Sequence, residues 1–244
     1  AWIARRSSGP LPAPVPQRPN VLLGSHDPLL EWALRESRCG LATFLDGSLD
    51  GIDRFANGEG VATGLHVYVP DADDWNAPLV SRRFARDAVV LLELAWRDRG
   101  LIVAPGAGGG IRRLDDLRGR RVVPRQAAAG SQVLLEHLLE RHGVAASELE
   151  LTAPARSETD AALAVLDGKA DAAFGLPCLA RQYQLGFVPI VRERFDLLVD
   201  RRAWFEPPLQ RLAGFCRSAA FATKAGELPG YDVAGLGRVH FNGA

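Results

Sequence analysis

The sequence predicts an α/β protein with two lobes and a ligand cleft between them. Short apolar runs alternate with amphipathic segments along most of the 244 residues, which is typical of βαβ units and a mostly parallel sheet. This alternation stops at a glycine-rich stretch, residues 106–110, and then begins again. A late apolar run, residues 195–199, must return to the first series. Two series with a late return predict two lobes rather than a single continuous sheet.

The composition is ordinary for a globular chain, with 47% hydrophobic and 24% charged residues. The formal net charge is zero, so nothing favours binding of nucleic acid through a broad basic surface. No apolar stretch approaches the roughly 20 residues of a membrane span. Cys39, Cys178 and Cys216 are far apart, which argues against a disulfide framework and fits a reducing compartment. No Cys or His pair has the spacing of metal ligands, so we expect no metal and no cofactor.

In the first series each apolar run reads as a buried strand that leads into a helix. Pro28 suits the first turn of the first helix, and Gly58 ends the second. We expect strands over residues 21–24, 41–45, 61–69, 89–95 and 101–104, and helices over residues 28–37, 50–57 and 80–87.

The second series contains the most strongly amphipathic helix, which Gly143 closes. Residues 231–232 are expected in a closing turn. We expect strands over residues 121–123, 149–152, 170–174, 187–191 and 195–199, and helices over residues 114–117, 131–142, 158–166, 179–185, 207–217 and 219–225.

These elements place lobe one at residues 20–105 plus 195–244 and lobe two at residues 106–194. Residues 1–19 are interpreted as the tail of a removed domain followed by a spacer, because five prolines fall between Gly9 and Pro19. The sequence contains no Met, so we expect a further segment upstream. The glycine-rich stretch lacks the Lys-Ser/Thr pair of a phosphate loop, which excludes that nucleotide motif.

Three strand-to-helix junctions suggest one converging anion pocket. A helix N-terminus offers unpaired N–H groups and partial positive charge, and serine or glycine there admits an anion to the backbone. We therefore expect Ser25, Ser48, Arg125, Gly130 and Ser131 to face one cavity at the C-terminal strand ends. The alternatives are that Ser and Gly merely cap helices, and that the arginine forms a permanent salt bridge with an acid of the 158–160 segment.

Three further polar residues fall near these junctions. His26 is expected to line the pocket without a catalytic role, because it and Asp27 are adjacent and rarely point into one site. His66 lies near the C-terminal end of a strand, where a satisfied core histidine is the commoner outcome. Asp160 lies near a helix start, so a first-turn carboxylate is its alternative role.

A set of short motifs in order resembles the molybdate-binding-protein-like family of type II periplasmic-binding folds. The resemblance covers residues 20–235 and rests on Gly24-Ser25-His26-Asp27-Pro28, Gly47-Ser48, Gly64-Leu65-His66, Arg125-Gln126, Gly130-Ser131, Glu158-Thr159, Gly168-Lys169-Ala170-Asp171, Gly186-Phe187-Val188-Pro189 and Gly230-Tyr231-Asp232.

The resemblance implies a two-lobed type II periplasmic-binding-protein-like fold and a cytoplasmic ligand sensor, not an enzyme. Members occur behind helix-turn-helix regulators, so DNA would be bound only by a missing N-terminal domain, with no membrane partner and a homodimer as one arrangement. The implied ligand is a small oxyanion, molybdate or tungstate. Its implied binding residues are Ser25, His26, Ser48, His66, Arg125, Gln126, Gly130, Ser131 and Asp160.

The sequence departs from the family at three positions, which leaves the ligand's identity open. Pro124 replaces a usual Asn, Gln132 a frequent Arg, and Asp160 a common His. An exported solute-binding component of an oxyanion ABC transporter is the alternative, with the proline-rich stretch as a stalk. An enzyme using His26 and Asp27 is a further rival, but no nucleophile motif supports it.

Overall fold

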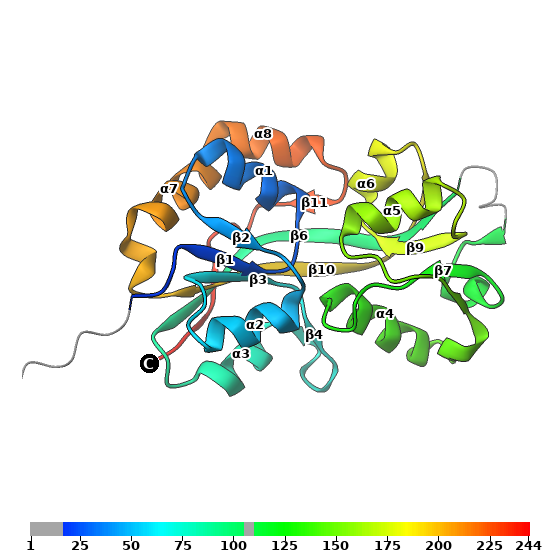
Figure 1. Ribbon diagram of the computed structural model, residues 1–244, viewed down its shortest axis with the longest axis horizontal. Coiled ribbons are helices and arrows are strands. Elements are labelled where there is room, and N and C mark those ends of the chain that lie inside the picture. Colours follow the sequence, from blue (N-terminus) through cyan, green and yellow to red (C-terminus); the bar gives the residue numbers. More distant parts are fainter. Residues whose placement is uncertain (1–16, 105–109) are drawn as a thin grey trace, which may run out of the picture.

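The computed structural model describes residues 17–104 and 110–244, and Figure 1 shows their arrangement. The expectations for residues 1–16 and for most of the glycine-rich stretch lie outside this range. The strands are β1 (Val21–Gly24), β2 (Ala42–Phe44), β3 (Ala62–Leu65), β4 (Tyr68–Val69), β5 (Asp74–Trp75), β6 (Val89–Val103), β7 (Arg121–Val123), β8 (Glu150–Leu151), β9 (Ala172–Gly175), β10 (Gly186–Asp200), β11 (Tyr231–Asp232) and β12 (Val239–Asn242).

The helices alternate with the strands along the chain. They are α1 (Pro28–Ser37), α2 (Ser48–Ala56), α3 (Ala77–Phe84), α4 (Gly130–Arg141), α5 (Glu158–Leu166), α6 (Pro177–Gln182), α7 (Pro207–Cys216) and α8 (Ala219–Glu227), with the 3₁₀ turns η1 (Pro70–Ala72), η3 (Leu114–Leu117), η4 (Ala146–Glu148) and η5 (Ala203–Phe205). Within the described ranges, no helix is long and apolar enough to cross a bilayer.

Two lobes share one sheet, because β6 and β10 run through both of them (Figure 1). The strand order is β2-β1-β3-β10-β6-β9-β7-β8, with β11 and β12 also pairing with β6. The two long strands have 15 residues each and pair antiparallel from Gly186–Val103 to Asp200–Val89. β3 pairs with one end of β10 and β9 with the opposite end of β6, so in residues 17–104 and 110–244 the two long strands connect β3 with β9.

The long strands correct three expectations. The sequence predicted each as two separate runs, in a mostly parallel sheet that would not be continuous between lobes. Instead β6 and β10 are unbroken and antiparallel to their neighbours, so the sheet is mixed and continuous. The charged residues that interrupt the apolar pattern, such as Arg97 and Arg99, are fully buried and paired, so the strand passes through them.

Smaller differences lie at element ends. The predicted strand 61–69 divides into β3 and β4, and β4 pairs with β5 in a separate small sheet. The predicted turn at residues 231–232 is β11, which pairs with β6. Residues 100–103, assigned to lobe one by the expected boundary at residue 105, pair with β9 among the strands of lobe two.

Helices cover both faces of the sheet in each lobe (Figure 1). In lobe one, α1, α7 and α8 cover one face over a core that includes Leu22, Leu212 and Phe221. On the other face α2 and α3 pack through Phe55 and Phe84. In lobe two, α4 lies on one face, and α5 and α6 lie on the other. These apolar layers fix the N-termini of the helices at the junction between the lobes.

The long antiparallel pair leaves no room for a side chain at Gly100. A methyl group there would lie 2.0 Å from the Val188 carbonyl oxygen and 2.9 Å from the ring of Phe187. We expect Gly100→Ala to lower the free energy of unfolding by about 1–3 kcal/mol, the usual cost of overpacking. Urea denaturation measures this change.

Gly214→Ala is the matched control, because nothing lies within 4 Å of the position in α7. Alanine there should raise the free energy of unfolding by about 1 kcal/mol through helix propensity. Equal effects of the two substitutions would contradict the close strand pairing.

Candidate functional site

The N-termini of α2 and α4 meet where the two lobes face each other. The backbone N–H of Leu49 in α2 donates to the carbonyl of Ala128, which precedes α4, at 3.1 Å. A methyl group at Gly130 would lie 2.6 Å from the His66 carbonyl oxygen and 2.9 Å from Ser48 Oγ. At Gly47 it would lie 2.8 Å from the Ala128 carbonyl oxygen. Glycines on both sides therefore allow the two backbones to touch.

These two helix ends have no side-chain cap, in contrast to the starts of α1 and α5. Asp27 caps α1 by accepting from the N–H of Leu30 at 2.7 Å, and Ser157 caps α5. In contrast, Gly47 and Ala129 make no side-chain cap hydrogen bond to α2 and α4. The orphan N–H groups of a helix end need an acceptor, and in α2 the carbonyl of Ala128 serves as one.

Serine hydroxyls surround this contact. The hydroxyls of Ser25 and Ser48 share a hydrogen bond of 2.6 Å, and Ser48 Oγ accepts from the backbone N–H of His66 at 3.2 Å. Ser131, at the start of α4, is 1% exposed, and its hydroxyl has no hydrogen-bond partner among the residues described. The structure therefore brings the predicted residues Ser25, Ser48, His66 and Gly130 together, with Ser131 adjoining them in α4.

A buried network of charges lies beside the hydroxyls and joins both lobes. Arg97 pairs with Asp27 of lobe one and with Glu193 of β10. Arg99 pairs with Glu193 at 2.8 Å and with Glu158 of α5 at 3.2 Å. Continuing into lobe two, the Glu158 carboxylate also lies 3.0 Å from the guanidinium of Arg125. The network thus runs without interruption from α1 to the end of β7.

The network is balanced in charge, with three guanidinium groups and three carboxylates. Burial favours the neutral form of Glu158, but the charges of Arg99 and Arg125 outweigh it and lower its pKa to about 2. Burial acts likewise on Glu193, and the charges of Arg97 and Arg99 still hold its pKa well below the usual value. All three arginines therefore face ionised carboxylates, and no net positive charge is left for a ligand.

His66 is neutral near pH 7. Burial lowers the pKa of this imidazole, and the nearby carboxylate of Glu193 offsets that effect only in part. Nδ1 lies 2.9 Å from Glu193 Oε2, so the neutral ring donates from Nδ1 and keeps Nε2 as an acceptor. The ring of Phe195 stacks on it, with centroids 5.7 Å apart.

Arg125, predicted as a ligand clamp, has partners within the protein. Besides Glu158, it donates to the carbonyls of Ala155 and Arg156 at 3.1 and 2.9 Å. The permanent salt bridge that the sequence left as the alternative is therefore present. This buried guanidinium orients the loop before α5, and its charge is matched by the carboxylate of Glu158.

Three other predicted residues lie apart from the hydroxyl cluster. Asp160 is exposed and completes a capping box with Ser157, so the first-turn role that the sequence also allowed is the one observed. His26 bonds through Nε2 to Glu31 at 2.9 Å. Gln126 is half-buried in the turn before α4.

Sequence reasoning missed the network itself. Asp27 caps α1 through one carboxylate oxygen, and its second oxygen also accepts from Arg97 and from the hydroxyl of Tyr231. Charges at alternate positions within long apolar runs, as in Arg97 and Arg99, were the available signal. A strand presents alternate residues to one face, so such a pair indicates a buried charged layer.

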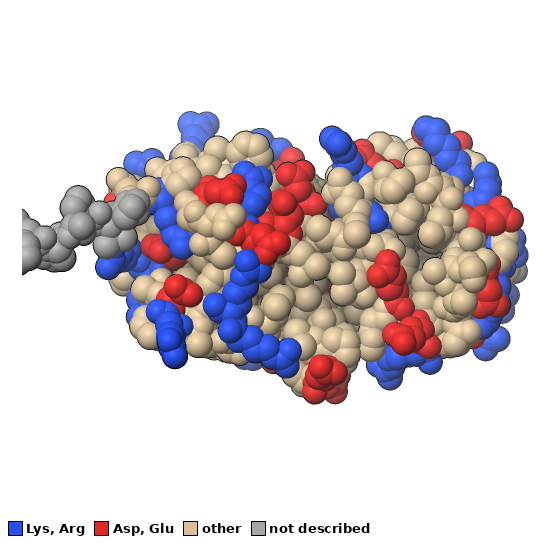
Figure 2. Space-filling model, turned by 60° about the horizontal axis from the view of Figure 1, so that its bottom comes forward, with Lys and Arg blue, Asp and Glu red and all other residues tan. Residues whose placement is uncertain are grey.

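The arrangement places hydroxyl groups and uncapped helix starts where they can donate hydrogen bonds to a ligand. In residues 17–104 and 110–244, no group of three or more His, Cys, Asp or Glu side chains could hold a metal ion. On the face shown in Figure 2, positive and negative side chains are interspersed on both lobes. The charge-balanced network lies in the interior and is separate from these surface charges.

The comparisons with known proteins agree with this architecture. A family model described as "PBP superfamily domain" matches residues 31–217. The chain is 27% identical to the "Uncharacterized protein YvgK" of Bacillus subtilis (strain 168) over 234 residues, which are 91% of this chain and 74% of that protein.

Solved structures share the fold at low sequence identity. The regulatory domain of NMB2055 (MetR), a LysR family regulator from N. meningitidis, has a TM-score of 0.60 at 12% identity, covering 87% of this chain and 95% of that one. PhnD1 from Prochlorococcus marinus (MIT 9301), in complex with methylphosphonate, has a TM-score of 0.57 at 10% identity, with coverages of 88% and 92%.

Removal of one network cation should destabilise the fold. Arg125→Ala leaves the buried carboxylate of Glu158 with fewer partners, and we expect the free energy of unfolding to fall by about 3–5 kcal/mol. Arg121→Ala is the control, because its ion pair with Asp171 is partly exposed and is expected to contribute about 0–1 kcal/mol. Urea denaturation compares them. A cost for Arg125→Ala no larger than that of the control would show that this arginine is not structural.

The network should also make stability depend on pH in the acid range. The pKa of Glu158 is about 2 in the folded protein against 4.5 ordinarily, so its stabilising contribution is complete above pH 4.5 and is lost as the pH falls toward 2. We expect a smaller acid-induced loss of stability in Glu158→Gln, measured by urea denaturation across that window.

Asp196 acts in the opposite direction. Burial raises the pKa of Asp196 to about 6, although the charge of Arg194 opposes this shift. The contribution of this carboxyl to the free energy of unfolding therefore becomes more favourable as the pH falls through 6. The parent protein and Glu158→Gln both contain Asp196, so the contribution of this residue cancels when the two are compared. Identical pH slopes for the two proteins would contradict the role assigned to Glu158.

Proposed function

We propose, from the premise that the chain belongs to the PBP superfamily, that it is a ligand-sensing binding domain. Its ligand is a small oxyanion, molybdate or tungstate, held between the lobes at the N-termini of α2 and α4. The carrying observation is that these two facing helix ends lack side-chain caps, and that the carbonyl of Ala128 lies where an acceptor oxygen is needed.

In this proposal neutral donors hold the anion. The three guanidinium groups of the network are already matched by carboxylates, which leaves hydroxyls and backbone N–H groups as the available donors. Ser48 and Ser131 lie at the starts of α2 and α4, and Ser25 bonds to Ser48. An oxyanion oxygen would replace the Ala128 carbonyl at Leu49 and would satisfy the unpartnered hydroxyl of Ser131.

Binding would act through the relative position of the lobes. The lobes touch in the present state, so the anion must first separate the Leu49–Ala128 contact and then bridge the two helix ends. The continuous strands β6 and β10 connect the lobes and provide the place where such a motion bends. A ligand shifts this equilibrium only by its differential affinity for the two arrangements.

The setting we propose is the cytoplasmic sensor of a transcription regulator, with DNA contacted by an upstream domain and with two copies in the active form. The family resemblance supports this setting, and the shared fold of the MetR regulatory domain fits it. An exported solute-binding component is the second candidate, which the shared fold of PhnD1 fits equally. Fractionation of cells that express the full-length protein separates the two.

Isothermal calorimetry with molybdate, tungstate, sulfate and phosphate tests the ligand. We expect saturable binding of molybdate or tungstate and at least about tenfold weaker affinity in Ser131→Ala, which loses one hydrogen bond to an ion. Ser37→Ala is the control, because its hydroxyl bonds to the Leu34 carbonyl at the far end of α1.

Thermal denaturation gives an independent measurement. Ligand at 100 times its dissociation constant should add about 2.7 kcal/mol to the free energy of unfolding. The proposal fails if none of the four oxyanions binds, or if Ser131→Ala and Ser37→Ala bind the same oxyanion equally well.

A further inference from the structure

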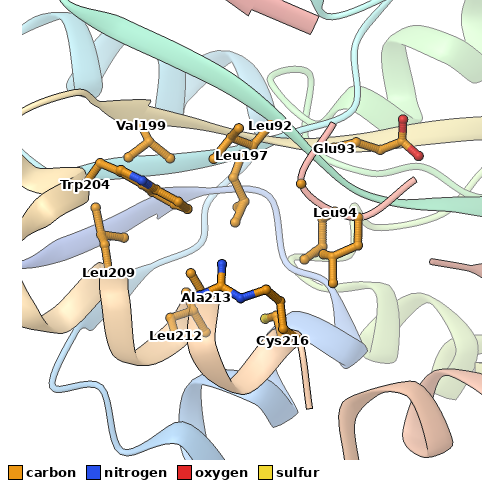
Figure 3. A pocket seen from close by; sticks show the side chains of 13 residues that line it. Leu92, Glu93, Leu94, Leu197, Val199, Trp204, Leu209, Leu212, Ala213 and Cys216 are labelled. Carbon is orange, nitrogen blue, oxygen red and sulfur yellow. The ribbon is translucent and has the colours of Figure 1, made fainter. Parts of the chain in front are cut away.

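An apolar cavity lies inside lobe one, away from the junction of the lobes. Its volume is about 140 Å³, and it separates α7 from the sheet strands β6 and β10 (Figure 3). Leucines of the sheet form its floor, Trp204 closes one end, and α7 forms the opposite wall. Its lining comprises Leu92, Glu93, Leu94, Leu197, Val199, Trp204, Leu209, Leu212, Ala213, Cys216, Arg217, Leu236 and Gly237.

A local irregularity of the sheet lies at the cavity. Phe195 pairs with Ala95 and Asp196 with Glu93, so Leu94 is an extra residue on β6 and forms a β-bulge. Leu94 lines the cavity, as do Leu92 and Leu197, which remain half-buried. Leu92 and Leu197 on the floor are therefore partly exposed, whereas α7 covers the rest of this core.

The acid on the lining does not enter the apolar space. In Figure 3 the carboxylate of Glu93 points away from the labelled leucines. It accepts instead from His240 Nε2 at 2.7 Å. Cys216 adds a buried thiol whose pKa burial raises to about 12, so it remains neutral and acts as a small apolar group.

One cation stands at the edge of this otherwise apolar lining. Arg217 follows α7 directly, lines the cavity and is exposed. Within the part of the chain that the structure describes, it has no ion-pair partner, whereas each of the four buried arginines, Arg97, Arg99, Arg125 and Arg194, has at least one. A ligand with an apolar body and an anionic end would fill the cavity and supply that partner.

We propose that this cavity binds a small carboxylic acid with an aromatic or short branched apolar body. The body lies between α7 and the floor of the sheet, and the carboxylate meets Arg217 at the edge. The volume fits one six-membered ring, since an apolar cavity of about 150 Å³ is known to accept benzene. This site is independent of the anion proposed between the lobes.

Calorimetry on the folded protein with phenylacetate and its uncharged analogue phenylacetamide tests the proposal. We expect saturable phenylacetate binding that weakens about tenfold or more in Ala213→Leu, where the larger side chain fills the cavity. Ala222→Leu is the matched control, because this alanine is exposed on the neighbouring helix α8. If Ala213→Leu does not fold, Leu197→Phe fills the same space from the floor.

The charge is tested separately on α7. Arg217→Gln should weaken phenylacetate about tenfold and leave phenylacetamide unchanged, while Arg211→Gln, exposed on the same helix, should change neither. The proposal is overturned if phenylacetate does not bind, if it binds both filled variants as well as the parent, or if Arg217→Gln has no effect on it. Phenylacetate bound between the lobes would give the second of these results.

Discussion

The constraint on which the rest of the structure depends is the burial of two guanidinium groups in the middle of β6. Arg97 and Arg99 are both fully buried, and a charge in such a place must be paired and hydrogen-bonded. Their partners come from three directions: α1 of lobe one, α5 of lobe two and the antiparallel strand β10. Satisfying them fixes the two lobes against the shared strands.

That requirement determines what lies at the junction. Asp27 has one oxygen for the N–H of its own helix and another for Arg97, so the start of α1 is fixed to β6. Glu158, in the first turn of α5, pairs with Arg99 and so fixes the start of α5 to the same strand. The starts of α1 and α5 are thereby occupied, whereas the starts of α2 and α4, which touch through Leu49 and Ala128, have no side-chain cap.

The balanced charges also restrict the chemistry of a ligand. A site whose cations are all neutralised by the protein cannot bind an anion by net charge, and it must rely on hydroxyl and N–H donors at helix ends. The neutral His66 and the hydroxyl pair of Ser25 and Ser48 fit such a site. The cavity inside lobe one differs in kind, because its lining is mostly apolar and its one cation stands at the edge.

The sequence by itself determined the local features of this protein. Apolar runs and caps located most helices and strands, including β1, α1 and α5 within a residue or less, and the serine-bearing junctions predicted which loops meet between the lobes. Periodicity and capping are local properties, so a single sequence carries them. Only the tertiary structure decided that β6 and β10 are continuous, that Arg125 forms an ion pair with Glu158, and that Arg97 and Arg99 are buried. Those outcomes depend on partners from distant segments, because a charge stays inside a strand only when the rest of the fold brings the opposite charge to it.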